Sequence, residues 1–450
     1  MGNGILSRSG SGNGAKIGDI RLTTRDSIGA KWALCNGDSI PSGSPIADFC
    51  AFNPTNASNW YDLSTVVTQV PNIVLYDPTD NVYWGIYLSV ISSDASARTL
   101  QIYRYDRDER GQYQSIVFST TIAAGASVYD ACFVHDEEYG NKIAFAYKNT
   151  NREEYIIFYD INSNTCTFSD TSANIFLGQW RALFESYGYD RTSITNGGNQ
   201  LTIAAAGRFV VIYCYDYEQF VVYDSRTNLE VHSLDFSDFD ISIIGYASGP
   251  RHTVILYNET EEYCTYALIV DNSTGEIYNR LVCSADMSIS GSSVSCIYEE
   301  SENCEYFVWW VHSDTTSCYR GCLKITSSGS VTDETVNNSM TVSIFGSYSV
   351  TFGSYYEFKL NDIYYALLMN SSAPNNHEIC ELNGKAMGIS SKSIITLGDI
   401  YSADRNIFGY KIGAPWYLLS NGYSKDIYFT IPCLPIIGEG SYNGFIKVEN

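Results

Sequence analysis

Acidic side chains are the residues of this sequence best placed to do chemistry. They gather in three short stretches, Asp235–Asp240 (DFSDFD), Glu299–Glu305 (EESENCE) and His135–Glu138 (HDEE). A glycosidase needs two carboxylates about 5–10 Å apart across a bound sugar. Acidic residues are also common in turns, where their side chains bond the local backbone. Solvated turns are therefore the favoured interpretation, and a glycosidase site is the alternative.

Metal-ligand spacings are missing from the sequence. Six cysteines fall between Cys264 and Cys322 without a CxxC spacing, so buried free thiols are favoured over a zinc site. The acidic stretches Asp77–Asp80 and Asp106–Glu109 lack the twelve-residue loop of a calcium site. Five histidines form neither HxH nor HExxH pairs; they are His135, His232, His252, His312 and His377. We predict no metal and no cofactor.

Sequence signatures of phosphate binding and of activated nucleophiles are also missing. The chain contains no GxxxxGK[ST], no strand-linked GxGxxG and no GxSxG. We therefore predict no catalytic residues and a protein that is not an enzyme.

Charge and hydropathy exclude two classes of partner. The chain has 450 residues with 27 Lys and Arg against 50 Asp and Glu, a net charge of −23. Binding to nucleic acid needs clustered basic residues, and adhesion to anionic membranes needs them too. No stretch approaches the roughly 20 apolar residues that span a bilayer. We predict neither nucleic-acid binding nor membrane insertion.

Aromatic residues are unusually frequent and indicate an all-β protein. The chain contains 37 Tyr, 20 Phe and 7 Trp, and these side chains favour the pleated, half-buried surfaces of strands. Tyrosine is also common at recognition surfaces. We expect a minority of aromatic residues to lie in loops and to bind a ligand; the candidates are Trp84, Tyr113, Tyr187, Tyr189 and Tyr355.

A recurrent sequence motif indicates a structural repeat. An apolar, aromatic run ends in an acidic or polar turn, and a new strand follows at a period near the ~40–50 residues of propeller repeats. Another apolar strand precedes most copies, for example Lys142–Tyr147 (KIAFAY). The copies are Gln101–Asp106 (QIYRYD), Tyr155–Asp160 (YIIFYD), Gln219–Asp224 (QFVVYD), Tyr266–Asp271 (YALIVD), Arg320–Thr326 (RGCLKIT) and Glu378–Asn383 (EICELN).

This unit favours a β-propeller. A four-stranded blade cannot bury both of its faces alone, so blades stack around a central axis. Residues 60–400 have room for six such units, or seven if one is degenerate. The predicted fold class is thus all-β, a β-propeller-like domain inserted in a small split β module.

The two ends of the chain supply that module. Residues 17–40 read IGDIRLTTRDSIGAKWALCNGDSI, which predicts two strands followed by a tight Asn-Gly turn. This string resembles the tail-collar or tail-fibre module of bacteriophages, and Ala33 departs from the large residue usual there. Tyr428–Leu434 (YFTIPCL) and Tyr442–Asn450 (YNGFIKVEN) resemble its later parts. The residues that carry the resemblance are Gly18, Asp19, Trp32, Cys35, Asn36, Gly37 and Pro432.

The resemblance implies a domain order and a function. We expect a flexible N-terminal arm at 1–16, the first half of the collar-like module at 17–59, the propeller at 60–400 and the second half of the module at 401–450. The implied protein is a structural component of a phage virion, assembled in the bacterial cytoplasm and homo-oligomeric. Its partners would be other tail or virion proteins and a glycan or protein of the host surface. A virion-borne depolymerase and a purely architectural tail or capsid component are the alternatives.

Overall fold

The structure is a computed structural model of the 450-residue chain. It describes residues 16–17, 19–35, 60–62, 73–77, 79–80, 82–88, 97–105, 115–123, 126–151, 153–168, 173–177, 202–214, 219–235, 241–259, 264–283, 294–312, 317–334, 336–341, 352–360, 363–370, 376–382, 389–396, 418–420, 427–430, 438–439 and 442–448. Within these residues all regular structure is β, which confirms the predicted class.

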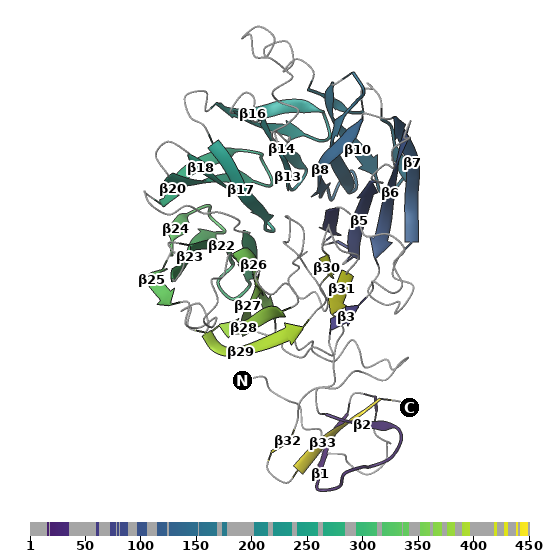
Figure 1. Ribbon diagram of the computed structural model, residues 1–450, viewed down its shortest axis with the longest axis vertical. Helices are drawn as coiled ribbons and strands as arrows, with labels where there is room; N and C mark the ends of the chain where they lie inside the picture. The colour runs from purple at the N-terminus through teal and green to yellow at the C-terminus, as the bar shows by residue number, and fades with distance from the viewer. Residues whose placement is uncertain are drawn as a thin grey trace.

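Seven antiparallel sheets of the described strands are arranged as a ring (Figure 1). Blade 1 contains β4 (Ile73–Asp77), β5 (Val82–Leu88), β6 (Ala97–Tyr105) and β7 (Ser115–Ala123). Blade 2 contains β8 (Ser127–Val134), β9 (Lys142–Lys148), β10 (Glu154–Asp160), β11 (Thr165–Cys166) and β12 (Ile175–Phe176). Blade 3 contains β13 (Thr202–Ala206), β14 (Phe209–Cys214), β15 (Gln219–Asp224) and β16 (Leu229–Asp235).

The next three blades repeat this order. Blade 4 contains β17 (Ile241–Ser248), β18 (His252–Glu259), β19 (Cys264–Asp271) and β20 (Ile277–Cys283). Blade 5 contains β21 (Ser295–Glu299), β22 (Cys304–His312), β23 (Ser317–Thr326), β24 (Val331–Asp333) and β25 (Val336–Thr341). Blade 6 contains β26 (Phe352–Leu360), β27 (Ile363–Asn370), β28 (Asn376–Leu382) and β29 (Ile389–Thr396).

The repeated sequence motif corresponds to the third strand of each of these six blades. Its copies overlap β6, β10, β15, β19, β23 and β28, and the strand before each copy is the second strand of the same blade. The motif recurs because every blade needs a hairpin turn that connects its third strand to its fourth. In blades 2, 3 and 4, Asp160, Asp224 and Asp271 accept backbone N–H bonds from two or three residues ahead. These are Asx turns.

The hydrophobic core lies between neighbouring blades rather than inside one of them. Along β9, Ile143, Phe145 and Tyr147 pack against blade 1, whereas Ala144 and Ala146 pack against blade 3. Two further clusters join blades 3 and 4 and blades 4 and 5. Strands buried on both faces have continuous apolar runs instead of alternation, which explains segments such as KIAFAY.

The seventh blade joins the two ends of the propeller. It contains β3 (Trp60–Asp62), β31 (Ile427–Thr430) and β30 (Leu418–Ser420), with β31 paired to both of the other strands. The ring is therefore closed by pairing an early strand with a late one. Six or seven units were expected from the sequence, and the described strands form seven. β30 and β31 fall in 401–450, which we had assigned to the collar-like module.

A small sheet of the chain ends lies outside the ring (Figure 1). β33 (Tyr442–Lys447) is its centre and pairs with β1 (Ile20–Thr23), β2 (Trp32–Leu34) and β32 (Gly438–Glu439). Phe445, Ile446 and Val448 are buried, although Ile20 and Leu22 are exposed. Strands from both ends of the chain thus belong to one sheet.

Two further features bear on earlier expectations. Of the cysteines that the structure describes in full, Cys166 is half-buried and the others are buried; all are free thiols, as the sequence predicted. Among the described residues, none belongs to a helix long and apolar enough to cross a membrane.

Candidate functional site

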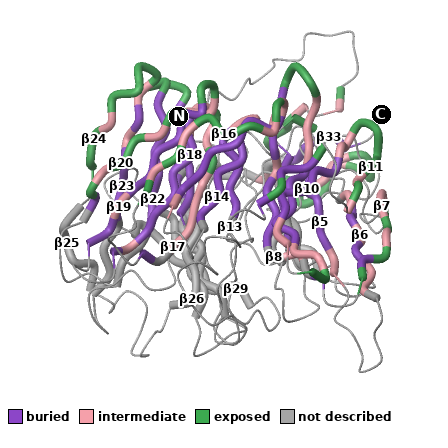
Figure 2. Tube along the Cα trace, turned by 90° about the horizontal axis from the view of Figure 1, so that it is seen from above, coloured by how far each residue is buried: buried purple, intermediate pink, exposed green. Residues whose placement is uncertain are grey.

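The turns at one end of the ring form the candidate site. In a meander of four antiparallel strands, the turns after the first and third strands lie at the same end. Figure 2 shows the described turns as exposed segments above the buried strands. Turns of blades 2 to 5 surround a cavity of about 1000 Å³, which also extends along β20 toward β24. It is lined by residues 135–137, 207–208, 226, 250–252, 271–273, 278–280 and 327–329, with Ile269, Ile325 and Val331.

An ion pair on one side of this cavity joins blades 2 and 3. The guanidinium of Arg226 donates from Nε to Oδ2 of Asp136 and from Nη2 to Oδ1, both at 2.7 Å. Its Nη1 lies 2.8 Å from Oε2 of Glu138, and the guanidinium covers the Tyr139 ring at 4.5 Å. The hydrogen bonds from Arg226 lower the pKa of Asp136 to about 2. Bidentate geometry and a buried carboxylate make this contact strong.

A buried histidine–carboxylate pair joins blades 4 and 5. His252 Nδ1 lies 2.6 Å from Oε2 of Glu305, which is fully buried. The backbone N–H groups of Arg251 and His252 donate to Oε1 of the same carboxylate at 2.7 and 3.3 Å. Gly249 is needed here because a Cβ at this position would overlap Glu305. An acceptor carboxylate places the proton on Nδ1, which leaves Nε2 as the nitrogen of His252 available to a ligand.

Four arginines line the cavity, although Lys and Arg are scarce in the chain. Arg208 lies 3.2 Å from Asp224, and Arg226 is paired as described above. Arg251 donates to the backbone oxygen of Asn303 at 3.0 Å, and Arg280 donates to that of Val331 at 2.8 Å. Among the described residues, neither the Arg251 nor the Arg280 guanidinium is paired with a carboxylate. Their charges are therefore available to a ligand.

Two of the carboxylates that line the cavity, those of Asp136 and Asp271, have lowered pKa values and are ionised at neutral pH. Asp136 is held ionised by Arg226. Burial alone would raise the pKa of Asp271, but hydrogen bonds from Ser273 and from the Thr274 backbone outweigh burial and lower it. A glycosidase needs one carboxylic acid whose pKa is raised. These two carboxylates do not meet that need.

The aromatic residues predicted to bind a ligand have different outcomes. Trp84 is 2% exposed in β5, and its indole Nε1 donates to Asp77 at 3.4 Å, so its assignment to a binding loop was wrong. An apolar run buried on both faces accounts for that error. Tyr355 lies in β26, where its backbone pairs with Leu368. Tyr113, Tyr187 and Tyr189 lie outside the described residues.

The predicted module residues that the structure describes cluster in the terminal sheet. The backbone oxygen of Asp19 accepts a hydrogen bond from the Lys447 N–H at 3.0 Å. Trp32 in β2 pairs with Lys447 in β33. Arg21 covers the Trp32 ring at 4.8 Å. Cys35 is buried, and burial raises its pKa to about 11. Gly18, Asn36, Gly37 and Pro432 lie outside the described residues, and the strand before Pro432, β31, belongs to blade 7.

Sequence reasoning found none of the cavity arginines. The acidic stretch His135–Glu138 was noted, and it does line the cavity in part. The stretch Glu299–Glu305 supplies Glu305, the partner of His252. One signal was present: Arg208, Arg226 and Arg251 lie in turns of the repeat, whereas Arg280 lies within β20. Only the stacking of blades brings Arg208, Arg226, Arg251 and Arg280 to the same cavity.

The described residues contain no group of three His, Cys, Asp or Glu side chains able to hold a metal ion.

The comparisons with known proteins found neither a matching family model nor a matching curated protein. Among solved structures, hydrazine synthase of Kuenenia stuttgartiensis is similar over 82% of this chain and 98% of its own, at 10% identity and a TM-score of 0.44. A chain of a nidogen/laminin complex is similar over 65% of this chain and 89% of its own, at 8% identity and a TM-score of 0.32.

Proposed function

We propose that this chain is a non-catalytic structural protein of a bacteriophage virion, associated with the tail or a fibre. The sheet of β1, β2, β32 and β33 would anchor it to other virion proteins, and the propeller would recognise a glycan or protein of the host surface. One observation carries the proposal: both ends of the chain meet in a small sheet outside the ring (Figure 1).

The anchoring sheet and the ring suit two different tasks. A sheet built from both chain ends is joined to the inserted ring by two chain segments instead of one. Its blades are joined by shared cores and by the pairs Arg226–Asp136 and His252–Glu305. A rigid surface loses little entropy when it binds a partner, which favours display and recognition.

The lowered pKa values of Asp136 and Asp271 support recognition over hydrolysis. A depolymerase of the usual two-carboxylate kind would need a protonated acid at neutral pH. The alternative is tested by adding purified protein to host polysaccharide and measuring new reducing ends. Reducing ends that increase in proportion to protein and time would support the depolymerase and contradict this proposal.

Adhesion and particle mapping test the proposal directly. We expect purified protein to adhere to host cells, and soluble host surface material to block that adhesion. In a density map of the assembled particle, the terminal sheet should contact neighbouring virion proteins while the cavity end of the ring faces outward. A ring that contacts only virion neighbours would support the architectural alternative, and absence from the particle would overturn the proposal.

A further inference from the structure

The part of the cavity lined by blades 4 and 5 has the chemistry of a site for an anionic sugar. We propose that Arg251 and Arg280 bind the acidic groups of an anionic glycan, a ligand class that deepens the proposed function and rests on it. Both arginines line the cavity, one in the turn before β18 and the other in β20.

The guanidinium groups are positioned but only partly used. Arg251 donates one bond to the Asn303 backbone oxygen, and its guanidinium lies 5.4 Å from the centre of the Tyr298 ring. Arg280 donates one bond to the Val331 backbone oxygen. A guanidinium has five N–H donors in a planar fork that matches a carboxylate or sulfate. Each arginine therefore keeps donors for a ligand.

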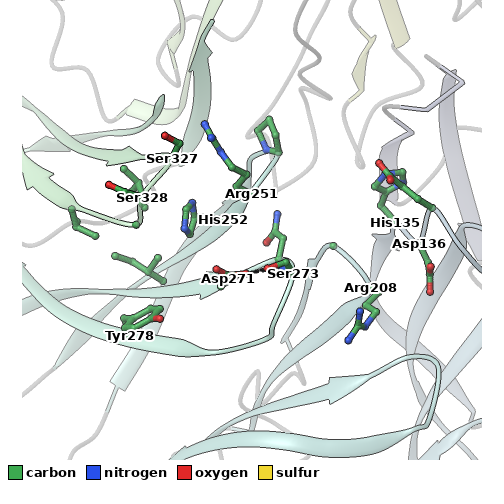
Figure 3. Close-up of a pocket in the computed structure, with 18 of the residues that line it drawn as sticks. His135, Asp136, Arg208, Arg251, His252, Asp271, Ser273, Tyr278, Ser327 and Ser328 are labelled. Atoms are coloured by element: carbon green, nitrogen blue, oxygen red, sulfur yellow. Dashed lines mark hydrogen bonds and ion pairs between the residues drawn. The ribbon is translucent and has the colours of Figure 1, made fainter. Parts of the chain in front are cut away.

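The rest of the lining matches a sugar. Figure 3 shows Arg251, His252, Ser327 and Ser328 on one side of the cavity, with Tyr278 on the same side. Among the described residues, the Ser327 hydroxyl has no hydrogen-bond partner. Tyr278 is 52% exposed and lines the cavity, so its ring can contact a sugar there. His252 adds Nε2 as a further polar contact, since its Nδ1 is held by Glu305.

The overall charge selects against other polyanions. A net charge of −23 repels densely charged chains such as nucleic acids, whose binding depends on many phosphate contacts. Two unpaired arginines among hydroxyl and amide groups fit a ligand with few charges and many hydroxyls. Carboxylated and sulfated glycans share this chemistry, and the experiment separates them.

Calorimetry on the purified full-length chain tests the proposal with three probes: oligogalacturonate for carboxylated sugar, a sparsely sulfated dextran for sulfated sugar, and unmodified dextran. We expect at least one anionic probe to bind and dextran not to bind, with affinity falling as salt is raised. The anionic probe that binds identifies the acidic group. Equal binding of dextran, or no binding of either anionic probe at low salt, would overturn the proposal.

Variants locate the site. Arg280→Gln and Arg251→Gln should each weaken binding of the anionic probe by about tenfold or more, the loss expected for one charge-assisted contact. Arg104→Gln is the matched control, because Arg104 pairs with Asp80 in blade 1 outside the cavity. Arg104→Gln should bind like the wild type. Equal affinity of all three variants and the wild type would contradict the proposal.

A second pair of variants adds charge instead of removing an arginine, and it guards against a loss of binding through misfolding. Ser327→Asp adds a negative charge at an exposed turn on the same side of the cavity as Arg251 (Figure 3), and Ser163→Asp adds one at an exposed turn of blade 2 outside the cavity lining. Only Ser327→Asp should weaken binding. Because these are binding measurements on isolated protein, they are independent of adhesion to host cells. Binding of anionic sugar without adhesion would leave this inference standing and count against the proposed function, and adhesion without such binding would do the reverse.

Discussion

At the scale of single residues, buried polar contacts connect one blade to the next. The Asp136 side chain is 2% exposed in its turn, and its only cationic partner among the described residues is Arg226 of the next blade. Removing one member of a buried pair leaves the other without compensation. This contact should therefore contribute measurably to the stability of the ring.

We expect Asp136→Asn to lower the free energy of unfolding at pH 7 by about 2 kcal/mol, from the lowered pKa of Asp136. A carboxylate whose pKa is lower in the folded state stabilises that state above its ordinary pKa of 3.8, and the stabilisation is lost as the pH falls toward about 2. Urea unfolding of variant and wild type should show a difference that shrinks over this range. Glu137→Gln is the control, because that side chain is 91% exposed. An equal effect of both variants would contradict the assignment.

The close approach of the Gly321 backbone to the Trp309 indole gives a second prediction at this scale. Trp309 is 1% exposed, and its indole lies against Gly321 of the paired strand β23. A Cβ on Gly321 would overlap that indole. Gly321→Ala should lower stability by about 1–3 kcal/mol through overpacking.

The control for this prediction is a double-mutant cycle with Trp309→Phe. The smaller ring makes room for the added methyl group, so the double variant should lose less stability than the sum of the two single variants. Thermal or urea unfolding of all four proteins measures the coupling. Strict additivity would show that the two residues do not crowd each other.

At the scale of elements, the hairpin after the third strand is the repeated unit of the fold. Asp271 begins this turn in blade 4, and Gly275 ends it with a φ of +77°. In blade 5, Gly329 ends the equivalent turn with the same φ. In blades 2 and 3 the residue at this place is Asn164 or Asn228, also with positive φ. Only glycine and, less readily, asparagine adopt this conformation easily.

These two glycines provide a matched pair of substitutions. Gly329→Ala should lower stability by about 1 kcal/mol, the usual cost of a side chain at positive φ, because its Cβ would meet nothing within 4 Å. Gly275→Ala should lower stability further, because its Cβ would lie 3.0 Å from the Phe209 ring of blade 3. Denaturant unfolding measures both. Equal losses would show that the Phe209 contact relaxes at no cost.

At the scale of the whole molecule, two separate pairings of early and late strands organise the chain. Phe429 in β31 pairs with Tyr61 of β3 and closes the ring. Gly444 in β33 pairs with Leu22 of β1 and holds the terminal sheet. Because the two sheets are distinct, disrupting one should leave the other in place.

Proline substitutions test this independence, since proline removes a backbone donor from the middle of a sheet. Phe429→Pro should lower the melting temperature of the ring by about 2–5 °C and speed hydrogen exchange in β3 and β30. Gly444→Pro should speed exchange in β1 and β2 while leaving blades 1 to 6 protected. Faster exchange throughout the ring in Gly444→Pro would show that the terminal sheet is part of the same cooperative unit.

The sequence by itself determined the strand class, the repeat and its hairpins, because apolar runs and Asp-led turns such as DNSTG at 271–275 act through near neighbours in the chain. The association of residues 17–40 with 442–450 was predicted only through their resemblance to a phage collar module, and β1, β2 and β33 of these segments do share a sheet. Only the tertiary structure decided that Trp84 is core and that Arg208, Arg226, Arg251 and Arg280 share one cavity. The physical reason is that burial and charge clustering depend on how separate blades stack, and no local pattern specifies that stacking.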